Sequence, residues 1–468
     1  MTSLTLAIVV VFIIGYLCIA IESVTKVNKA AVALLMFVFC WTLFMLDPNA
    51  YMPGVTGQDL INQVSHVIEK HLGSTSTTLF FLMGAMTIVE VVDQNGGFNF
   101  VRDVMKTKSK RALLWRIAFM TFVLSAILDN LTTSIVMIMI LRKLVHSHED
   151  RLIYASLVII AANAGGAFSP IGDVTTIMLW NKGVITALGV MEEIFLPSVV
   201  AMVVPAFIMQ YSLKGELEMA EVNMKSDYHV LDFTERQRKV IFVVGVGGLM
   251  FVPIFKSLTH LPPFVGILLV LGVLWTVTEV FYRGLDHKKD GMGKRVSKLL
   301  SNIDMSTILF FLGILMAVAC LEEIGVLGGL GVWLNDVSNG NHYVVTGVIG
   351  VISSIVDNVP LVAGCMGMYP LEAVGDMAID GIFWQLLAYC AGVGGSILIV
   401  QQRVRRGGDG PGEDYLRLVY EACQLVGLRW LPCRYLELLA HPFIHHTYAL
   451  MISLNNALQN GTVGLIET

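Results

Sequence analysis

Apolar runs of about 20 residues dominate this sequence, and short polar segments separate them. The first two runs are Leu4–Ile21 and Ala30–Leu46. A helix of about 20 apolar residues is long enough to cross the hydrocarbon core of a bilayer. Hydrophobic residues make up 55% of the chain and charged residues only 14%, against about 25% charged residues in soluble proteins. We therefore predict an all-α polytopic membrane protein that lies in a lipid bilayer.

Several features argue against other classes of protein. The first apolar run has no basic region before it and no small-residue cleavage site, so we expect it to be retained. The seven cysteines form no Cys-x-x-Cys pair and lie mostly in apolar runs, which favours buried thiols. No Gly-x-x-x-x-Gly-Lys-Ser/Thr loop occurs, which argues against a nucleotide-driven pump. We expect no enzyme activity, no cofactor and no nucleic-acid partner.

Basic residues gather in two polar segments, Asn99–Arg116 and Arg283–Lys298. Because cytoplasmic loops carry an excess of Lys and Arg, both segments are predicted to be cytoplasmic. Lys26 and Lys29 then lie inside as well, and the acidic, proline-containing stretch Asp47–His71 forms an external loop. The N-terminus is predicted to be external.

Two Asp-Asn pairs interrupt long apolar runs: Asp129-Asn130 within Leu113–Leu141, and Asp357-Asn358 within Tyr343–Leu371. As one straight helix the first run would be about 43 Å long, beyond a hydrocarbon core of about 30 Å. Basic residues also stand at both of its ends. We predict that each run is a re-entrant hairpin with its Asp-Asn pair at the tip, where irregular backbone must be buried in protein or line a cavity.

A helix broken within the membrane is predicted at Ala161–Thr176. Two adjacent glycines, a proline and a third glycine lie in this stretch, and a break frees backbone carbonyls to act as ligands. Asn163, Asp173 and Thr175 supply side-chain oxygens there.

The second half of the chain repeats the first. Three anchors recur at offsets of 228 to 230 residues: Phe80 with Phe310, Asp129 with Asp357, and Gly165 with Gly394. The basic segments give the two copies opposite senses in the membrane, so we predict two inverted-topology repeats, each with a re-entrant hairpin and a discontinuous helix. This architecture is typical of secondary transporters.

The predicted organisation follows from these features. It comprises N-terminal transmembrane helices and an external loop (residues 1–76), repeat 1 with its tip at 129–130 (77–213), a cytoplasmic linker (214–239), helices and a basic loop (240–303), repeat 2 with its tip at 357–358 (304–399) and an aberrant tail (400–468).

The duplicated carboxylates indicate an ion site. An acidic residue in the middle of a membrane costs about 2.5–3.5 kcal/mol on insertion scales, although turn residues satisfied by backbone amides are the alternative. Carboxylate, amide and carbonyl oxygens suit a small hard cation. No basic residue is expected near either tip, whereas an anion site would require one. A proton and a cation would compete for one carboxylate, which predicts proton-coupled antiport.

Four motifs carry a resemblance to a known family: Met83–Glu90, Asp129–Thr132, Ser169–Thr176 and Asp357–Pro360. On these motifs the chain resembles the NhaD-type sodium/proton antiporters of the ion transporter superfamily, over nearly all of Met1–Ile399. The resemblance implies exchange of Na⁺ or Li⁺ for H⁺ by alternating access. We expect a multi-pass protein of the bacterial inner membrane, with a homodimer as one assembly to test.

The ion-site candidates combine carboxylates with nearby amides and hydroxyls. They are Asp129, Asn130, Thr132, Asn163, Asp173, Thr175, Ser353, Asp357, Asn358 and Ser396. The resemblance implies that seven of them match positions on which the family depends, namely Asp129, Asn163, Asp173, Thr175, Ser353, Asn358 and Ser396. Hydrogen bonds between helices are the alternative role for the hydroxyls and amides. Two other functions stay open, namely a sodium-coupled carrier of dicarboxylates or other organic anions from the same superfamily, and a membrane scaffold that transports nothing.

The chain departs from the family pattern after Ile399. A last membrane span is expected there, but the sequence becomes basic and glycine-rich at Gln401–Gly408 and then shows no clean apolar run of about 20 residues. We predict a frameshift near Val400 that removes the last span.

Overall fold

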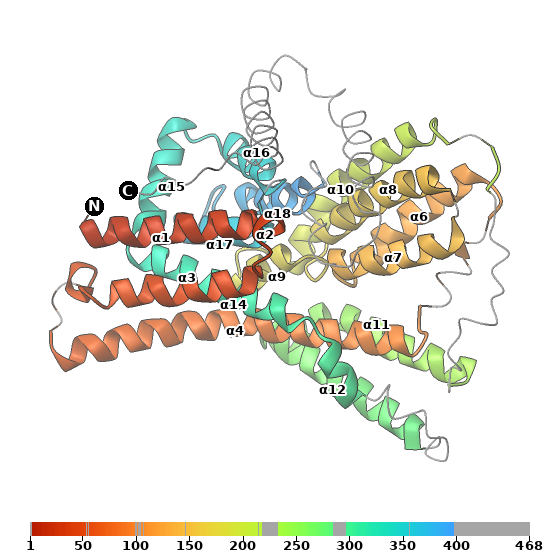
Figure 1. Cartoon of the computed structure of the whole chain (residues 1–468), viewed down its shortest axis with the longest axis horizontal. Helices are drawn as coiled ribbons and strands as arrows, with labels where there is room; N and C mark the ends of the chain where they lie inside the picture. Colours follow the sequence, from red (N-terminus) through yellow and green to blue (C-terminus); the bar gives the residue numbers. More distant parts are fainter. Residues whose placement is uncertain are drawn as a thin grey trace, which may run out of the picture. The chain divides into compact units, whose positions relative to one another are not determined.

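The fold was analysed in a computed structural model of the chain (Figure 1). The structure describes residues 2–396 apart from residues 53, 55, 99–100, 102–103, 106, 146, 214, 218–232, 284–295 and 355. The tail 400–468 and the frameshift predicted in it lie outside the described residues. Regular secondary structure within the described part is helical, with one isolated bridge between Ser109 and Glu216. The all-α prediction is confirmed.

The chain begins with two apolar helices that match the first two predicted spans. The elements of this part are α1 (Ser3–Ala20), α2 (Glu22–Thr25), α3 (Lys29–Phe44), the 3-10 helix η1 (Pro48–Ala50) and α4 (Gln58–Gln94). Thr2 caps α1 and Asn28 caps α3, each by accepting a hydrogen bond from a backbone amide of the first turn.

Helix α4 corrects the prediction that Asp47–His71 is a loop. The helix begins at Gln58 and continues for 37 residues, so the loop ends well before His71. Leu60 and Val64 are buried on one face of this first part. His71 Nε2 lies 2.7 Å from Glu323 Oε1, which ties the helix to α14. These tertiary contacts keep a polar sequence helical where apolar length alone predicted a loop.

Five helices build the rest of the first half. They are α6 (Lys110–Ser125), α7 (Asn130–Leu144), α8 (His148–Ala167), α9 (Val174–Lys182) and α10 (Ala187–Met209). The break between α6 and α7 falls at the first Asp-Asn pair, and the break between α8 and α9 falls within the predicted discontinuous stretch.

The described residues of the second half form eight α-helices and a 3-10 helix. They are α11 (Glu235–Thr259), α12 (Pro263–Arg283), α13 (Val296–Leu299), η3 (Leu300–Asn302), α14 (Met305–Glu323), α15 (Val326–Val337), α16 (His342–Ser353), α17 (Asn358–Met368) and α18 (Ile382–Gly394). Helix α11 starts inside the predicted linker because Thr234 and Gln237 form a capping box. Helix α15 was not predicted.

Six of the described helices are long and apolar enough to cross a membrane, namely α1, α4, α10, α11, α12 and α14. Their surroundings differ. In the most apolar 18-residue window of each helix, 72% of the residues of α14 and 61% of those of α4 are buried, against only 11% of those of α1. The exposed apolar side chains of α1, α10, α11 and α12 therefore suit contact with lipid, and α4 and α14 belong to the protein interior.

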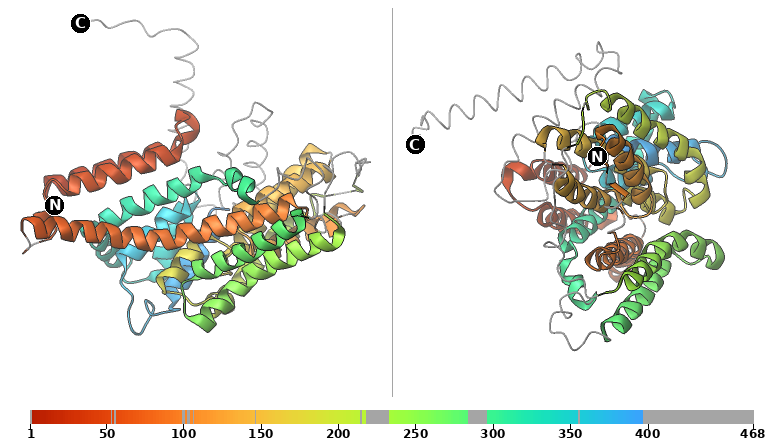
Figure 2. Two further views of the ribbon diagram at one scale, coloured as in Figure 1. Left: turned by 90° about the horizontal axis from the view of Figure 1, so that it is seen from below. Right: turned by 90° about the vertical axis from the view of Figure 1, so that its right-hand side faces the viewer.

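The helix breaks come together between two groups of helices. In Figure 1, α6, α7 and α8 lie on the right and α1 and α3 on the left, with α9 and α18 between them; Figure 2 shows the same molecule from two further sides. Helices α6 and α7 both pack against α8, and α16 and α17 both pack against α18. The same three-helix arrangement thus occurs in both halves of the chain.

A hydrogen bond recurs at the offset found in the sequence. The Ser125 hydroxyl at the end of α6 donates to the Ala162 carbonyl of α8 at 2.5 Å. The Ser353 hydroxyl at the end of α16 donates to the Ala391 carbonyl of α18 at 2.8 Å. All four residues are buried. Both halves therefore join the helix before the tip to the neighbouring helix in the same way.

A close backbone approach recurs as well. A Cβ atom on Gly165 would lie 2.2 Å from the Phe122 carbonyl oxygen, and one on Gly394 would lie 2.3 Å from the Gly350 carbonyl oxygen. Gly165 was expected to break its helix, but α8 continues through it to Ala167. Glycine is needed here because two helices touch along their backbones.

Replacing Gly165 by alanine tests this packing. The added methyl group would meet a backbone carbonyl that cannot move aside, so Gly165→Ala should destabilise the protein by about 1–3 kcal/mol. Gly247→Ala is the matched control, because a Cβ atom there meets nothing within 4 Å. Thermal unfolding of the detergent-purified variants measures the difference. Equal melting temperatures for the two variants would contradict the close approach.

Candidate functional site

The first tip is built by the start of α7. Asp129 caps this helix, with one carboxylate oxygen accepting from the Thr132 amide at 2.8 Å and the other from the Thr132 hydroxyl at 2.5 Å. Asn130 is the first residue of the helix. Local capping explains why Asp and Thr stand three residues apart, and it holds the carboxylate at the helix N-terminus, where negative charge is favoured.

The discontinuous helix places a second carboxylate in the interior. Asp173 caps α9 by accepting from the Thr175 amide at 3.3 Å, and only 1% of Asp173 is exposed. The buried Thr175 hydroxyl faces the same carboxylate and makes no hydrogen bond of good geometry with the described residues. An under-used hydroxyl beside a buried acid is a pair of oxygens that a cation could bind.

Amide side chains link the first tip to the broken helix and to the end of α18. The Asn130 backbone amide donates to the Gly172 carbonyl at 3.2 Å. Its side-chain amide donates to Asn163 Oδ1 at 3.1 Å, and Asn163 Nδ2 donates to Ser396 Oγ at 2.9 Å. The chain of bonds therefore brings together three of the predicted site residues from three elements.

The second tip reaches the same centre through its asparagine. Asp357 caps α17, accepting from the Val359 amide at 3.3 Å. The Asn358 amide donates to both carboxylate oxygens of Asp173, at 3.3 and 3.5 Å. The negative charges of Asp129 and Asp357 both act on the Asp173 carboxylate. Asp173 is therefore the group at which the two halves of the chain meet.

Asp357 itself has a partner that sequence reasoning missed. Lys29 Nζ, from the start of α3, lies 3.2 Å from Asp357 Oδ2. The prediction that no basic residue lies near either tip is therefore wrong for the second tip. The two residues are 328 positions apart, so no local signal could have paired them.

Ser353 has a structural contact instead of a place in this network. Its hydroxyl is fully buried and donates to the Ala391 carbonyl, as described above. The alternative role of joining helices therefore accounts for Ser353.

The described residues contain no group of three or more Asp, Glu, His or Cys side chains placed to hold a metal ion. A cation would have to combine carboxylate oxygens with amide and hydroxyl oxygens. Asn130 and Asn358 use their amide nitrogens in the bonds above, which leaves their oxygens for another partner. This donor set of oxygens alone suits a small hard cation.

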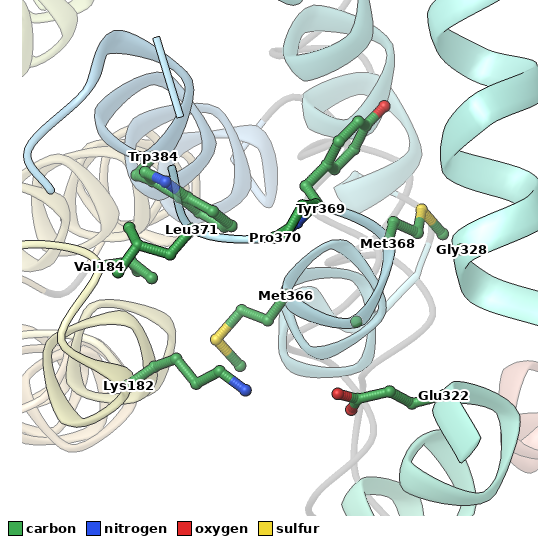
Figure 3. Close-up of a pocket in the computed structure, with 11 residues that line it drawn as sticks. Lys182, Val184, Glu322, Gly328, Met366, Met368, Tyr369, Pro370, Leu371 and Trp384 are labelled. Atoms are coloured by element: carbon green, nitrogen blue, oxygen red, sulfur yellow. The ribbon is translucent and has the colours of Figure 1, made fainter. Parts of the chain in front are cut away.

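A cavity of about 470 Å³ lies at the far ends of α9 and α17. Figure 3 shows Lys182 and Glu322 pointing into it from opposite sides, with Met366 between them. Asp173 and Asp357 cap the opposite ends of the same two helices, about 14–17 Å away along the helix axes. The cavity is separate from the polar centre and connected to it by α9 and α17. Sequence analysis did not predict its lining.

Apolar helices of membrane-spanning length, together with buried polar groups at helix breaks, define a multi-pass membrane protein with a polar centre in its interior. The sequence assigns it more closely. The chain belongs to the citrate transporter family (CitMHS), which matches residues 16–394.

Similar proteins come from a plant and from bacteria. Sodium/proton antiporter 1 of Arabidopsis thaliana is 44% identical over 395 residues, which cover 84% of this chain and 65%, just under two thirds, of that relative. Sodium/proton antiporter 2 of the same plant is 41% identical over 83% of this chain and 88% of the relative. The Na(+)/H(+) antiporter NhaD of Vibrio cholerae is 28% identical over 84% of this chain and 82% of the relative. The resemblance to NhaD-type antiporters is confirmed.

Replacing Asn163 by leucine tests the amide chain. Leucine has a similar size but cannot bond to either Asn130 or Ser396, so a part-buried amide loses its acceptor. We expect Asn163→Leu to lower stability by about 1–3 kcal/mol. Asn62→Leu on the exposed face of α4 is the control. Thermal unfolding in detergent provides the comparison. If Asn163→Leu is no less stable than the control, the hydrogen bonds of Asn163 to Asn130 and Ser396 do not stabilise the protein.

Proposed function

We propose that this protein is a secondary active transporter that exchanges Na⁺ or Li⁺ for H⁺. The observation that carries the proposal is the placement of Asp173. Its carboxylate is 1% exposed, lies at a helix N-terminus, receives the Asn358 amide and has the Thr175 hydroxyl beside it. The names of the similar plant and bacterial antiporters support Na⁺ and H⁺ as the exchanged ions.

The chemistry of exchange follows from the cost of a buried charge. An ionised carboxylate in an apolar interior must be neutralised, and either a proton or a cation can do so. Asp129 adds a second negative charge that acts on Asp173, which favours binding of a positive ion. Because Na⁺ and H⁺ then exclude each other at Asp173, release of one is linked to uptake of the other.

Alternating access by two inverted repeats is part of the proposal. The recurring bonds of Ser125 and Ser353 and the recurring close approaches of Gly165 and Gly394 support an internal duplication. Basic residues at the start of α6 and in the last turn of α7, against acidic residues around α16 and α17, support opposite insertion of the two tips. Irregular backbone is tolerated at membrane depth where it is buried in protein or lines a cavity. The tip residues Asp129, Asn130, Asp357 and Asn358 are half-buried.

A sodium-coupled carrier for organic anions is the second candidate, because the family description names a citrate transporter. Three carboxylates near one centre would repel a di- or tricarboxylate. The basic residue near the centre, Lys29, is already paired with Asp357. Cation exchange therefore fits the charges better. The bacterial inner membrane and the homodimer stay predictions, since the similar proteins include both plant and bacterial examples.

Proton release from acid-loaded inverted vesicles tests the exchange. Addition of Na⁺ should release protons from vesicles that contain this protein. Asp129→Asn and Asp173→Asn should each reduce the rate at least about 100-fold, because a lost unit charge in a partly desolvated site is worth several kcal/mol. Asp59→Asn, at the exposed start of α4, should leave the rate unchanged.

Other outcomes of this assay point elsewhere. Absence of Na⁺-dependent proton release from the unmodified chain would contradict the exchange. Citrate- or succinate-dependent uptake of Na⁺ would instead support the organic-anion carrier.

Single cysteines report the proposed orientation. Lys182→Cys, beside the cavity, should react with a membrane-impermeant maleimide added outside intact cells. Arg111→Cys, on the exposed start of α6, should react only after the membrane is opened. The unmodified chain gives the background from the native cysteines. Labelling of both positions from the same side would contradict the proposed orientation of the first repeat.

A further inference from the structure

The ion pair between Lys29 and Asp357 joins two elements that the sequence keeps far apart. Lys29 Nζ lies 3.2 Å from Asp357 Oδ2 and 4.0 Å from the centre of the Phe310 ring of α14. The two charged side chains are only 20% and 24% exposed. An ammonium group held by a carboxylate and an aromatic face is restricted to one position and is partly shielded from solvent.

Both members of the pair are anchored through their backbones. The Lys29 amide donates to Glu22 Oε1 at 3.2 Å, and Asn28 caps α3 directly before it. Asp357 caps α17. The Tyr16 phenol of α1 also interacts electrostatically with Asp357. The Lys29 ammonium, 3.2 Å away, faces this carboxylate as its cation.

The repeat supplies an internal comparison. Asp129 and Asp357 occupy equivalent positions, each capping the helix that follows its tip. Asp129 has the Thr132 hydroxyl as its partner, whereas Asp357 has an ammonium group. Two positions that share a helix-capping role thus differ by one positive charge.

We propose that Lys29 acts as a built-in cation for Asp357, which excludes the transported cation from the second tip and confines it to Asp173 and the first tip. Lys29 is then a specificity-determining residue that sets how many cations the centre holds. This inference rests on the proposed cation exchange. It assigns Asp357 to charge balance and excludes it from direct binding of Na⁺.

The proposal predicts opposite effects of the two single substitutions on Na⁺ affinity. Lys29→Met leaves an extra negative charge near the centre, so the Kd for Na⁺ should fall on the order of tenfold. Asp357→Asn leaves an extra positive charge, so the Kd should rise on the order of tenfold. The double variant is neutral at this position and should return close to the Kd of the unmodified protein. Lys29→Arg keeps the charge and should change little.

Equilibrium binding of radioactive Na⁺ to the detergent-purified full chain measures these constants, with thermal unfolding as the check on folding. If Asp357 binds Na⁺ directly, the double variant will bind as poorly as Asp357→Asn, and the proposal is overturned. If the pair is only structural, all variants will lose stability while the Kd stays constant, which also overturns it. Should Lys29→Met fail to fold, Lys29→Gln with the double variant gives the same comparison.

The binding assay separates this inference from the proposed function. An unmodified protein that binds no Na⁺ would contradict the exchange itself. An unmodified protein that binds Na⁺, with a Kd that does not respond to Lys29, would contradict only the role of Lys29.

Discussion

The structure depends on one constraint, which is that every backbone break inside an apolar bundle must find hydrogen-bond partners within the protein. Three breaks use the same solution. Asp129, Asp173 and Asp357 each cap the helix that follows, so the groups that satisfy the backbone are also the groups that carry charge. Capping the broken helices with aspartate therefore places negative charges in the interior. The other polar side chains of the network supply the partners that these charges need.

These partners are weak individually, which suits a protein proposed to change conformation. Amide bonds tie Asn130 to Asn163, Asn163 to Ser396, and Asn358 to Asp173. Hydrogen bonds between membrane helices contribute about 0.6 kcal/mol each, so such links can be exchanged at little cost. The buried glycine contacts, in contrast, fit backbone to backbone and leave no room to adjust. Rigid packing within each three-helix unit and weaker polar links between units would let the units move as bodies.

Sequence reasoning succeeded where the determinants are local. Apolar length located α1 and α3, and the Asp-Asn pairs located both breaks. It failed where tertiary contacts decide. The polar first part of α4 is held by its pair with Glu323, and Lys29 meets Asp357 across 328 positions. The glycine pair was misread because close approach and helix breaking favour the same residue, and only the neighbouring backbone distinguishes them.

The two halves share their packing but not their chemistry. Gly392 stands at the same offset from Asn163 that separates the recurring packing contacts, and a Cβ atom on it would lie 3.3 Å from Asp173 Oδ2. A side chain as large as asparagine at 392 would therefore push against the carboxylate that the first half supplies. In the second half, Lys29 pairs with Asp357, whereas Asp129 of the first half has a hydroxyl partner. The two halves therefore share their helix contacts, whereas their polar groups differ, and the polar groups that meet at Asp173 are arranged asymmetrically.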